Sequence, residues 1–225
     1  MNVLTRGGVE FLAVFLGLFL SLWFDDYQED KEVNRRLKED YRKIHIEIKE
    51  DLVHIDTLIS NNLKIVKDEE YLLSVLNGYK VFNFDTVVTI VSNLVAPTFF
   101  GNQSAYSASV ASGRFNMSKD DDLVQPISKL YEHYYKRLKL NGDLIDQRSE
   151  AFDREHALLF FKPIYKSTSV DTSSIKDYFY DDKFHNGLLL YHDFRKKYYL
   201  QRLRDTREKL VEVERVIMNY FTNNS

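Results

Sequence analysis

The sequence begins with a run of apolar residues and then becomes strongly charged. Residues 9–24 (VEFLAVFLGLFLSLWF) form an apolar run that is interrupted by Glu10. Together with the residues before it, this run approaches the roughly 20 residues that a helix needs to cross a hydrocarbon core of about 30 Å. The pattern therefore predicts a transmembrane anchor over residues 1–26 and a helical domain over residues 27–225.

A cleaved signal peptide and a buried core helix are two other structures that such a run can form. A signal peptide carries a basic region before the apolar run and small residues at its cleavage site. Here Arg6 is the one basic side chain before the run, and the sequence after it (SLWFDD) offers no such site. Because the run is near the lower length limit for a membrane span, a buried core helix remains an alternative. We expect an uncleaved anchor, with Trp23 at the level of the lipid headgroups.

Small side chains recur every four residues within the run, at Ala13, Gly17 and Ser21. Small residues at this spacing let two helices approach closely in lipid. Glu10 lies seven residues before Gly17 and therefore near the same face. Its carboxylate can cap the start of the helix, which we favour, or form an ion- or proton-handling ring in a homo-oligomer. This face predicts self-association within the membrane.

Beyond the anchor, apolar residues are spaced 4-4-3 in an eleven-residue repeat. This hendecad stripe consists of Val33, Leu37, Tyr41, Ile44, Ile48, Leu52, Ile55, Ile59, Leu63 and Val66. Eleven residues in three turns keep the stripe nearly straight along a helix. Polar residues between these positions, Glu47 and Asp51 among them, are expected on a solvated face. The stripe can pack within the chain or between two copies, and packing within the chain is the plainer expectation.

Two long helices are predicted, one at each end of the helical domain. Neither proline nor glycine occurs between Gly17 and Gly78, so the first should leave the membrane and continue over about residues 27–77. Heptad spacing returns near the other end, at Leu203, Thr206, Leu210, Val213, Ile217 and Tyr220, and is extended backwards by Leu188, Tyr191 and Tyr198. This second pattern predicts a helix over about residues 182–221. Each helix alone exposes an apolar stripe, so the two should pair antiparallel.

Shorter helices are expected between the two long ones. Asp85 is expected to cap a helix over residues 86–95, which Pro97 stops. A helix over residues 103–112 should end at Gly113. Ser118, with an acid three residues later, reads as the N-cap of the next helix. That helix carries its apolar face at Leu123, Ile127, Leu130, Tyr134, Leu138 and Ile145.

The remaining segment, residues 162–181, contains Pro163 and many serines and threonines, so we expect a loop there. No strand pattern of useful length is present. The sequence therefore predicts an all-α protein, in which an N-terminal transmembrane helix continues into an antiparallel helical bundle.

Composition and charge narrow the range of partners. The net charge is −3, and basic residues are interleaved with acids, so nucleic acid is not expected as a partner. The absence of cysteine excludes a thiol nucleophile and cysteine-based metal sites.

Basic residues after the run favour a cytoplasmic body, but four acids precede them and long domains translocate largely regardless of charge. We expect a single-pass protein of a bacterial inner membrane with an extracytoplasmic, periplasmic body.

Catalytic signatures are not found in the sequence. It contains no phosphate-binding glycine loop, no H-E-x-x-H and no G-x-S-x-G. Three Asp-x-x-His pairs place both groups on one helix face: Asp51/His54, Asp153/His156 and Asp182/His185. Di-iron bundles use Glu-x-x-His twice with further inward glutamates. We therefore expect solvated or capping roles for these pairs, and assign no catalytic residue, metal or cofactor.

Several segments follow one another in an order that a known family shares. They are Gly8-Val9-Glu10 with Gly17, Leu18 and Trp23, then Ser109–Phe115, Leu123–Tyr135 and Phe184-His185-Asn186. In this order the chain resembles an uncharacterised family of single-anchor helical proteins of Gram-negative bacteria, known as a domain of unknown function. The resemblance implies an anchored bundle and supplies no reaction.

Three functions are compatible with these observations. We favour a membrane-anchored interaction module, a scaffold or sensor that binds a still unidentified protein through its bundle. A subunit of a homo-oligomeric pore or ion-coupled assembly that uses Glu10 is the alternative. A helical metalloenzyme, which depends on the Asp-x-x-His pairs, ranks last, and we do not expect an enzyme.

Overall fold

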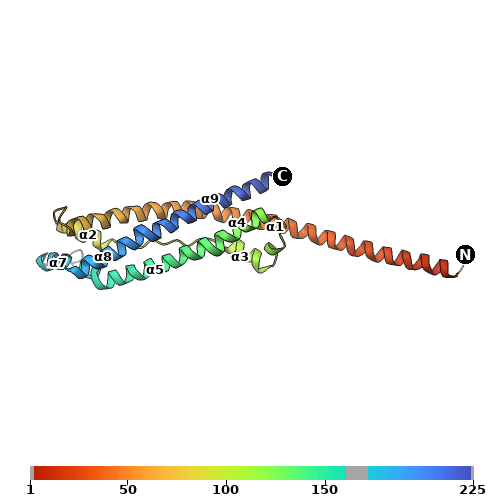
Figure 1. Ribbon diagram of the computed structural model, residues 1–225, viewed down its shortest axis with the longest axis horizontal. Coiled ribbons are helices and arrows are strands. Elements are labelled where there is room, and N and C mark those ends of the chain that lie inside the picture. Colours follow the sequence, from red (N-terminus) through yellow and green to blue (C-terminus); the bar gives the residue numbers. More distant parts are fainter. Residues whose placement is uncertain (1–2, 161–171, 224–225) are drawn as a thin grey trace.

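The computed structural model describes residues 3–160 and 172–223, without the side chains of residues 3–10 and 13. A long helix, α1 (Val3–Leu76), projects well beyond one end of an elongated bundle (Figure 1). Two further helical rods lie along the second half of α1 and complete the bundle. In the described part of the chain every regular element is helical, which confirms the all-helical prediction.

Helix α1 is unbroken over 74 residues, about 110 Å at the usual rise per residue. Its sequence contains neither proline nor glycine between Gly17 and Gly78, which has a φ of +77°. The Tyr79 amide then donates to the Ser74 carbonyl at 2.8 Å and closes the helix end. The predicted long first helix, which packs against other helices of the chain, is therefore confirmed.

The second rod runs from α4 (Asp121–Lys129) through a π-helical turn, η2 (Leu130–Tyr135), into α5 (Lys136–Phe152) and a further π turn, η3 (Asp153–Ala157). Asp120 caps α4 by accepting from the Leu123 amide at 3.2 Å. The prediction that Ser118 is this cap is wrong, because its hydroxyl lies before the helix and accepts from Tyr41 and from the Asp120 amide. The predicted apolar face of this rod is buried apart from the half-buried Tyr134.

The third rod consists of α8 (Asp182–Phe194), a π turn η4 (Arg195–Tyr199) and α9 (Leu200–Asn223). It confirms the second long helix and returns along α1, with which α9 makes the most extensive packing of the bundle. Tyr198, expected on the buried face, is 57% exposed, and the neighbouring Tyr199 is buried instead. A π turn takes up extra residues, so it shifts the apolar face along the sequence.

Four short elements complete the fold: α2 (Phe84–Ser92), α3 (Ser104–Ala111), η1 (Phe115–Met117) and α7 (Thr172–Phe179). Asn83 caps α2 through the Thr86 amide at 2.9 Å. The prediction of Asp85 as this cap is wrong, because Asp85 already lies in the first turn. Helix α3 ends before Gly113, whose φ is +77°, as expected.

The segment predicted as a loop, residues 162–181, is helical where α7 runs. That part of the prediction is wrong, because Ile175 and Phe179 recur four residues apart and bury one face of a short helix. Residues 161–171 lie outside the described residues.

The bundle has two contiguous cores. One lies between α1, α4, α5 and α9 and contains buried tyrosines, such as Tyr41 and Tyr131. The other lies at the end of the bundle away from the projecting helix, where α2 and α7 meet the end of α1. Buried phenylalanines, such as Phe179 and Phe184, fill it. Both cores are rich in aromatic rings, which agrees with the composition.

Candidate functional site

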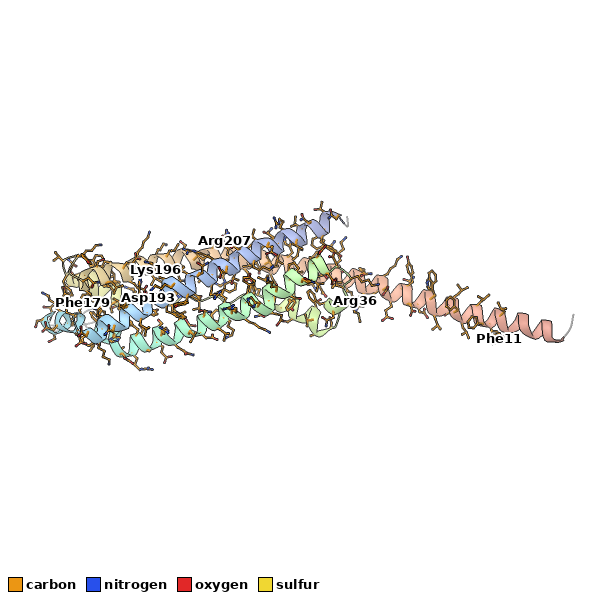
Figure 2. All side chains as sticks on the ribbon, in the orientation of Figure 1. Phe11, Arg36, Phe179, Asp193, Lys196 and Arg207 are labelled. Carbon is orange, nitrogen blue, oxygen red and sulfur yellow. The ribbon has the colours of Figure 1, made fainter. Side chains whose placement is uncertain are left out.

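The projecting end of α1 carries apolar side chains that no described part of the chain covers. Phe11 lies near the free end of this helix, whereas Arg36 lies where the helix meets the bundle (Figure 2). Between Phe11 and Phe24, every large apolar side chain that the structure describes is between 47% and 72% exposed. These residues are nearly consecutive, so they cover all faces of the helix instead of a single stripe.

Within this end, the rings of Phe11, Phe15 and Phe19 stack in sequence, with centroids 6.2 and 6.5 Å apart. Trp23 stacks on Tyr27 at 5.9 Å and is 59% exposed. The aromatic rings of this segment therefore contact one another and leave the rest of their surface open.

The small-residue face predicted for membrane helix packing is only partly described. Gly17 has open space around it, since an added Cβ would meet no atom within 4 Å, and Ser21 is exposed. The side chains of Glu10 and Ala13 lie outside the described residues. Within the described part of the chain, no helix combines the length and the apolar character needed to cross a membrane.

The hendecad stripe packs inside the bundle of its own chain. Leu37, Tyr41, Ile44, Ile48, Ile55 and Val66 are buried, and Val33, Leu52 and Ile59 are half-buried. Leu63 is 37% exposed. Beyond Ile55, four positions outside the predicted stripe are buried as well: Leu58, Asn62, Ile65 and Glu69. Two of these four are polar, which is why an apolar pattern did not reveal them.

A polar seam, formed by Asp40, Glu47, Asp51, Asn62 and Glu69, runs along α1 beside the apolar stripe. Four of the five are buried, and Glu47 is half-buried. They follow the same eleven-residue repeat, because Asp40, Asp51 and Asn62 are each eleven residues apart. The seam faces the segment 95–114, which runs antiparallel along α1. We therefore call residues 95–114 the crossing segment.

At one end of the seam, Asp40 receives three donors. Arg114 donates from Nε at 2.8 Å and from Nη2 at 3.2 Å, and the Ser109 hydroxyl donates at 2.8 Å. Burial of a carboxylate is tolerated when it is paired and hydrogen-bonded in this way. The pair fixes η1 and the end of α3 to α1.

In the middle of the seam, two carboxylates hold the start of α3. Glu47 accepts from the Ala105 amide at 3.0 Å, and Asp51 accepts from the Asn102 amide at 2.9 Å and from the Tyr135 hydroxyl. The N-cap residue of α3, Gln103, makes no capping bond of its own. A free amide in the first turn of α3, that of Ala105, is therefore satisfied from α1, where negative charge also favours the helix dipole.

Burial raises the pKa of both carboxyls, Glu47 and Asp51, and the hydrogen bonds to them offset part of that effect. The same packing is tight at Gly101, where an added Cβ would lie 2.3 Å from Cε2 of Tyr135. Glycine is needed here because the backbone approaches the ring closely.

At the far end of the seam, Arg195 of η4 is fully buried and joins three elements. Its Nε donates to Glu69 at 2.9 Å, its Nη1 donates to Oδ1 of Asn62 at 2.6 Å, and its Nη2 donates to the Val95 carbonyl at 2.8 Å. His192 contacts the other oxygen of Glu69 at 3.1 Å. Asn62 also donates to the Pro97 carbonyl at 3.1 Å.

The prediction that Glu47 and Asp51 lie on a solvated face is wrong. They lie half-buried and buried because the main chain of the crossing segment brings amide donors to them. The signal that could have found them is the repeat itself, since polar residues recur at the period of the apolar stripe. Arg195 had no such signal, because its burial depends on a π turn.

The three Asp-x-x-His pairs do not come together. Asp51 belongs to the seam, while the His54 ring packs beside Phe99 at 5.4 Å. His156 is buried and bonds the Tyr178 hydroxyl at 2.7 Å through Nδ1. Among the described residues, no group of three or more metal-ligating side chains gathers that could hold an ion.

Comparison with known proteins gives one match. Residues 10–188 match a family described as a family of unknown function, DUF6090. No curated protein matches the sequence, and no solved structure does.

Proposed function

Because this chain belongs to the DUF6090 family, whose function is unknown, we propose its role from the molecule itself. It is a membrane-anchored helical module, a scaffold or sensor, in which the apolar end of α1 enters a bilayer. The bundle then stands at the membrane surface and acts there through contacts with another protein. The anchor also brings copies of the chain together.

The observation that carries this proposal is the exposure of the apolar end of α1 on all its faces. Fully burying one large apolar side chain is worth about 1.5–3 kcal/mol, so leaving eleven of them in water is strongly unfavourable. A helix that is apolar all round is typical of a membrane or of the core of a larger assembly. A second copy of α1 would cover one face and leave the others exposed, so lipid is the better cover.

The residues that follow the apolar end support the same placement. Trp23 and Tyr27 are amphipathic rings of the kind found at lipid headgroups. Asp25 and Asp26 come directly after Phe24 and are exposed, which suits the water side of an interface. Because α1 continues unbroken into the bundle, the bundle is held on a stiff helix instead of a flexible linker.

Binding of the full chain to lipid vesicles tests the proposal. Vesicles of phosphatidylethanolamine and phosphatidylglycerol would be floated on a density gradient with purified protein. The wild type is expected to float. A double variant with Phe15→Asp and Leu18→Asp is expected to stay at the bottom, because charge near the middle of a span costs about 2.5–3.5 kcal/mol per residue.

The matched control is a double variant with Ile46→Asp and Val53→Asp. These residues are also exposed, at 57% and 70%, but lie on the part of α1 inside the bundle. This control should float like the wild type. A wild-type protein that stays at the bottom and sediments as a dimer would show that a second copy, and not lipid, covers the apolar end.

A further inference from the structure

Glu47 and Asp51, in the middle of the polar seam, are held without a lysine or arginine partner. At the ends of the seam, Arg114 pairs with Asp40 and Arg195 pairs with Glu69. Among the described residues, no lysine or arginine forms an ion pair with Glu47 or Asp51. Their negative charge is balanced by backbone amides, a tyrosine hydroxyl and the start of α3.

Tyr131 lies beside these carboxylates with its hydroxyl unused. The side chain is 1% exposed, and the hydroxyl has no hydrogen-bond partner among the described residues. Its ring stacks on Tyr106 of α3 at 4.4 Å, and burial raises the pKa of its hydroxyl, to which the charges of Glu47 and Asp51 add. A buried polar group without a hydrogen-bond partner is costly, and its presence requires an explanation.

We propose that Glu47 and Asp51, with Tyr131, form a proton-binding site that tightens α3 and the crossing segment against α1 as the pH falls. A proton on either carboxyl removes a buried or half-buried charge that is not paired with a lysine or arginine. It also lessens the repulsion between these carboxyls and the buried Tyr131 hydroxyl. The amide bonds from Asn102 and Ala105 persist, because a neutral carboxyl group still accepts.

Burial of Glu47 and Asp51 sets the direction in which pH changes the packing of the crossing segment. The titratable residues that face the site are Glu50 and His54 on α1, Tyr106 on α3, and Tyr131, Glu132 and Tyr135 on η2. Burial raises the pKa of Glu47 and Asp51, so the closed arrangement binds protons more strongly than an open, solvated one. The closed arrangement therefore weakens as the pH rises through the window between the ordinary carboxyl values and the raised ones.

This inference does not depend on membrane insertion, so its test measures amide protection in the crossing segment alone. Amide hydrogen exchange of the full chain in mild detergent would be followed at pH 5 and pH 7.5, with rates corrected for intrinsic exchange. Protection of residues 100–111 in the wild type is expected to be at least threefold higher at pH 5, relative to residues 205–217 of α9. In the double variant Glu47→Gln and Asp51→Asn, the protection of residues 100–111 should be the same at pH 5 and at pH 7.5.

The single variants Glu47→Gln and Asp51→Asn decide the result if the double variant fails to fold, and each should reduce the response. Glu208→Gln is the matched control, since Glu208 is exposed on α9, and it should respond like the wild type. Equal protection at both pH values in the wild type would overturn the proposal. Retention of the full response in folded single or double variants would also overturn it.

Discussion

Helix α1 is one continuous helix with two different surroundings. From Leu37 to Val75 its buried apolar side chains are 8% exposed or less, and they pack along one face against the rest of the chain. From Phe11 to Phe24 its described apolar side chains are about half exposed or more, on every face. The bundle therefore buries its apolar stripe without the projecting end, and the described residues leave the apolar side chains of that end exposed.

The covered half differs in a second way, since its packing includes polar groups. The seam pairs each buried carboxylate with donors from the crossing segment or from η4. Buried polar groups of this kind are costly to disrupt because the partner left behind stays unsatisfied. The largest expected effects of substitution therefore lie in this half.

Arg195→Met is expected to cause the largest loss. It leaves the fully buried Glu69 carboxylate with only His192, and breaking a buried ion pair costs about 3–5 kcal/mol. Urea unfolding of the full chain in mild detergent, followed by circular dichroism, measures the free energy of unfolding. Adding Glu69→Leu should recover part of the loss, and no recovery would show that packing of the arginine stem, and not its charge, matters.

Ile48→Ala and Leu18→Ala compare the two halves directly. Ile48 is fully buried, so its truncation should cost about 2–5 kcal/mol in the same urea experiment. Leu18 is 62% exposed and should change the free energy of unfolding of the bundle by less than about 0.5 kcal/mol. Similar losses in both variants would mean that the projecting end packs against protein.

Gly101→Ala tests how closely the crossing segment packs. The added methyl would clash with the ring of Tyr135, and such overpacking costs about 1–3 kcal/mol. Gly17→Ala is the matched control, because open space surrounds Gly17 in the described structure. The melting temperature of Gly101→Ala should fall, and that of Gly17→Ala should stay at the wild-type value.

His156 predicts a pH dependence opposite in sign to that of the seam. Burial lowers the pKa of His156, so the unfolded chain binds protons more strongly than the fold. Its contribution to stability is complete above the ordinary pKa of about 6.5 and is lost as the pH falls through the lowered value. Melting curves between pH 5 and 8 should lose this acid-side decrease in His156→Phe, while His133→Gln, at an exposed position, should retain it.

The smallest effect is expected at the surface where α1 enters the bundle. Arg35 pairs with Glu32 and Glu39, and all three side chains are exposed. Solvent screens such pairs, so Arg35→Ala should leave the melting temperature unchanged within error. A clear decrease would indicate that this surface is covered in the folded protein.

Much of the fold could be predicted because apolar periodicity is a local property of the chain. The unbroken α1, the rod that ends in α9 and the stop at Gly113 all follow from it. Tyr198 was misplaced because a π turn shifts the register, and nothing in the local sequence marks that turn.

The seam could not be predicted from the same pattern. Asp51 is buried only because Asn102 and Tyr135, far away in the sequence, bring donors to it. Arg195 likewise depends on partners from α1 and from the crossing segment. When the role of a residue is set by groups that are distant in the sequence, the local sequence pattern indicates it only weakly. Here the indication is the eleven-residue spacing of the polar positions.

Trp23 offers the most direct test of the central claim, which is that the end of α1 lies in lipid. It is the single tryptophan of the chain, so its fluorescence reports on this position alone. With the full chain in vesicles, we predict a blue-shifted emission that lipids brominated near the headgroups quench more strongly than lipids brominated deep in the acyl chains. An emission that stays at the position of a water-exposed indole, unquenched by either lipid, would contradict the account.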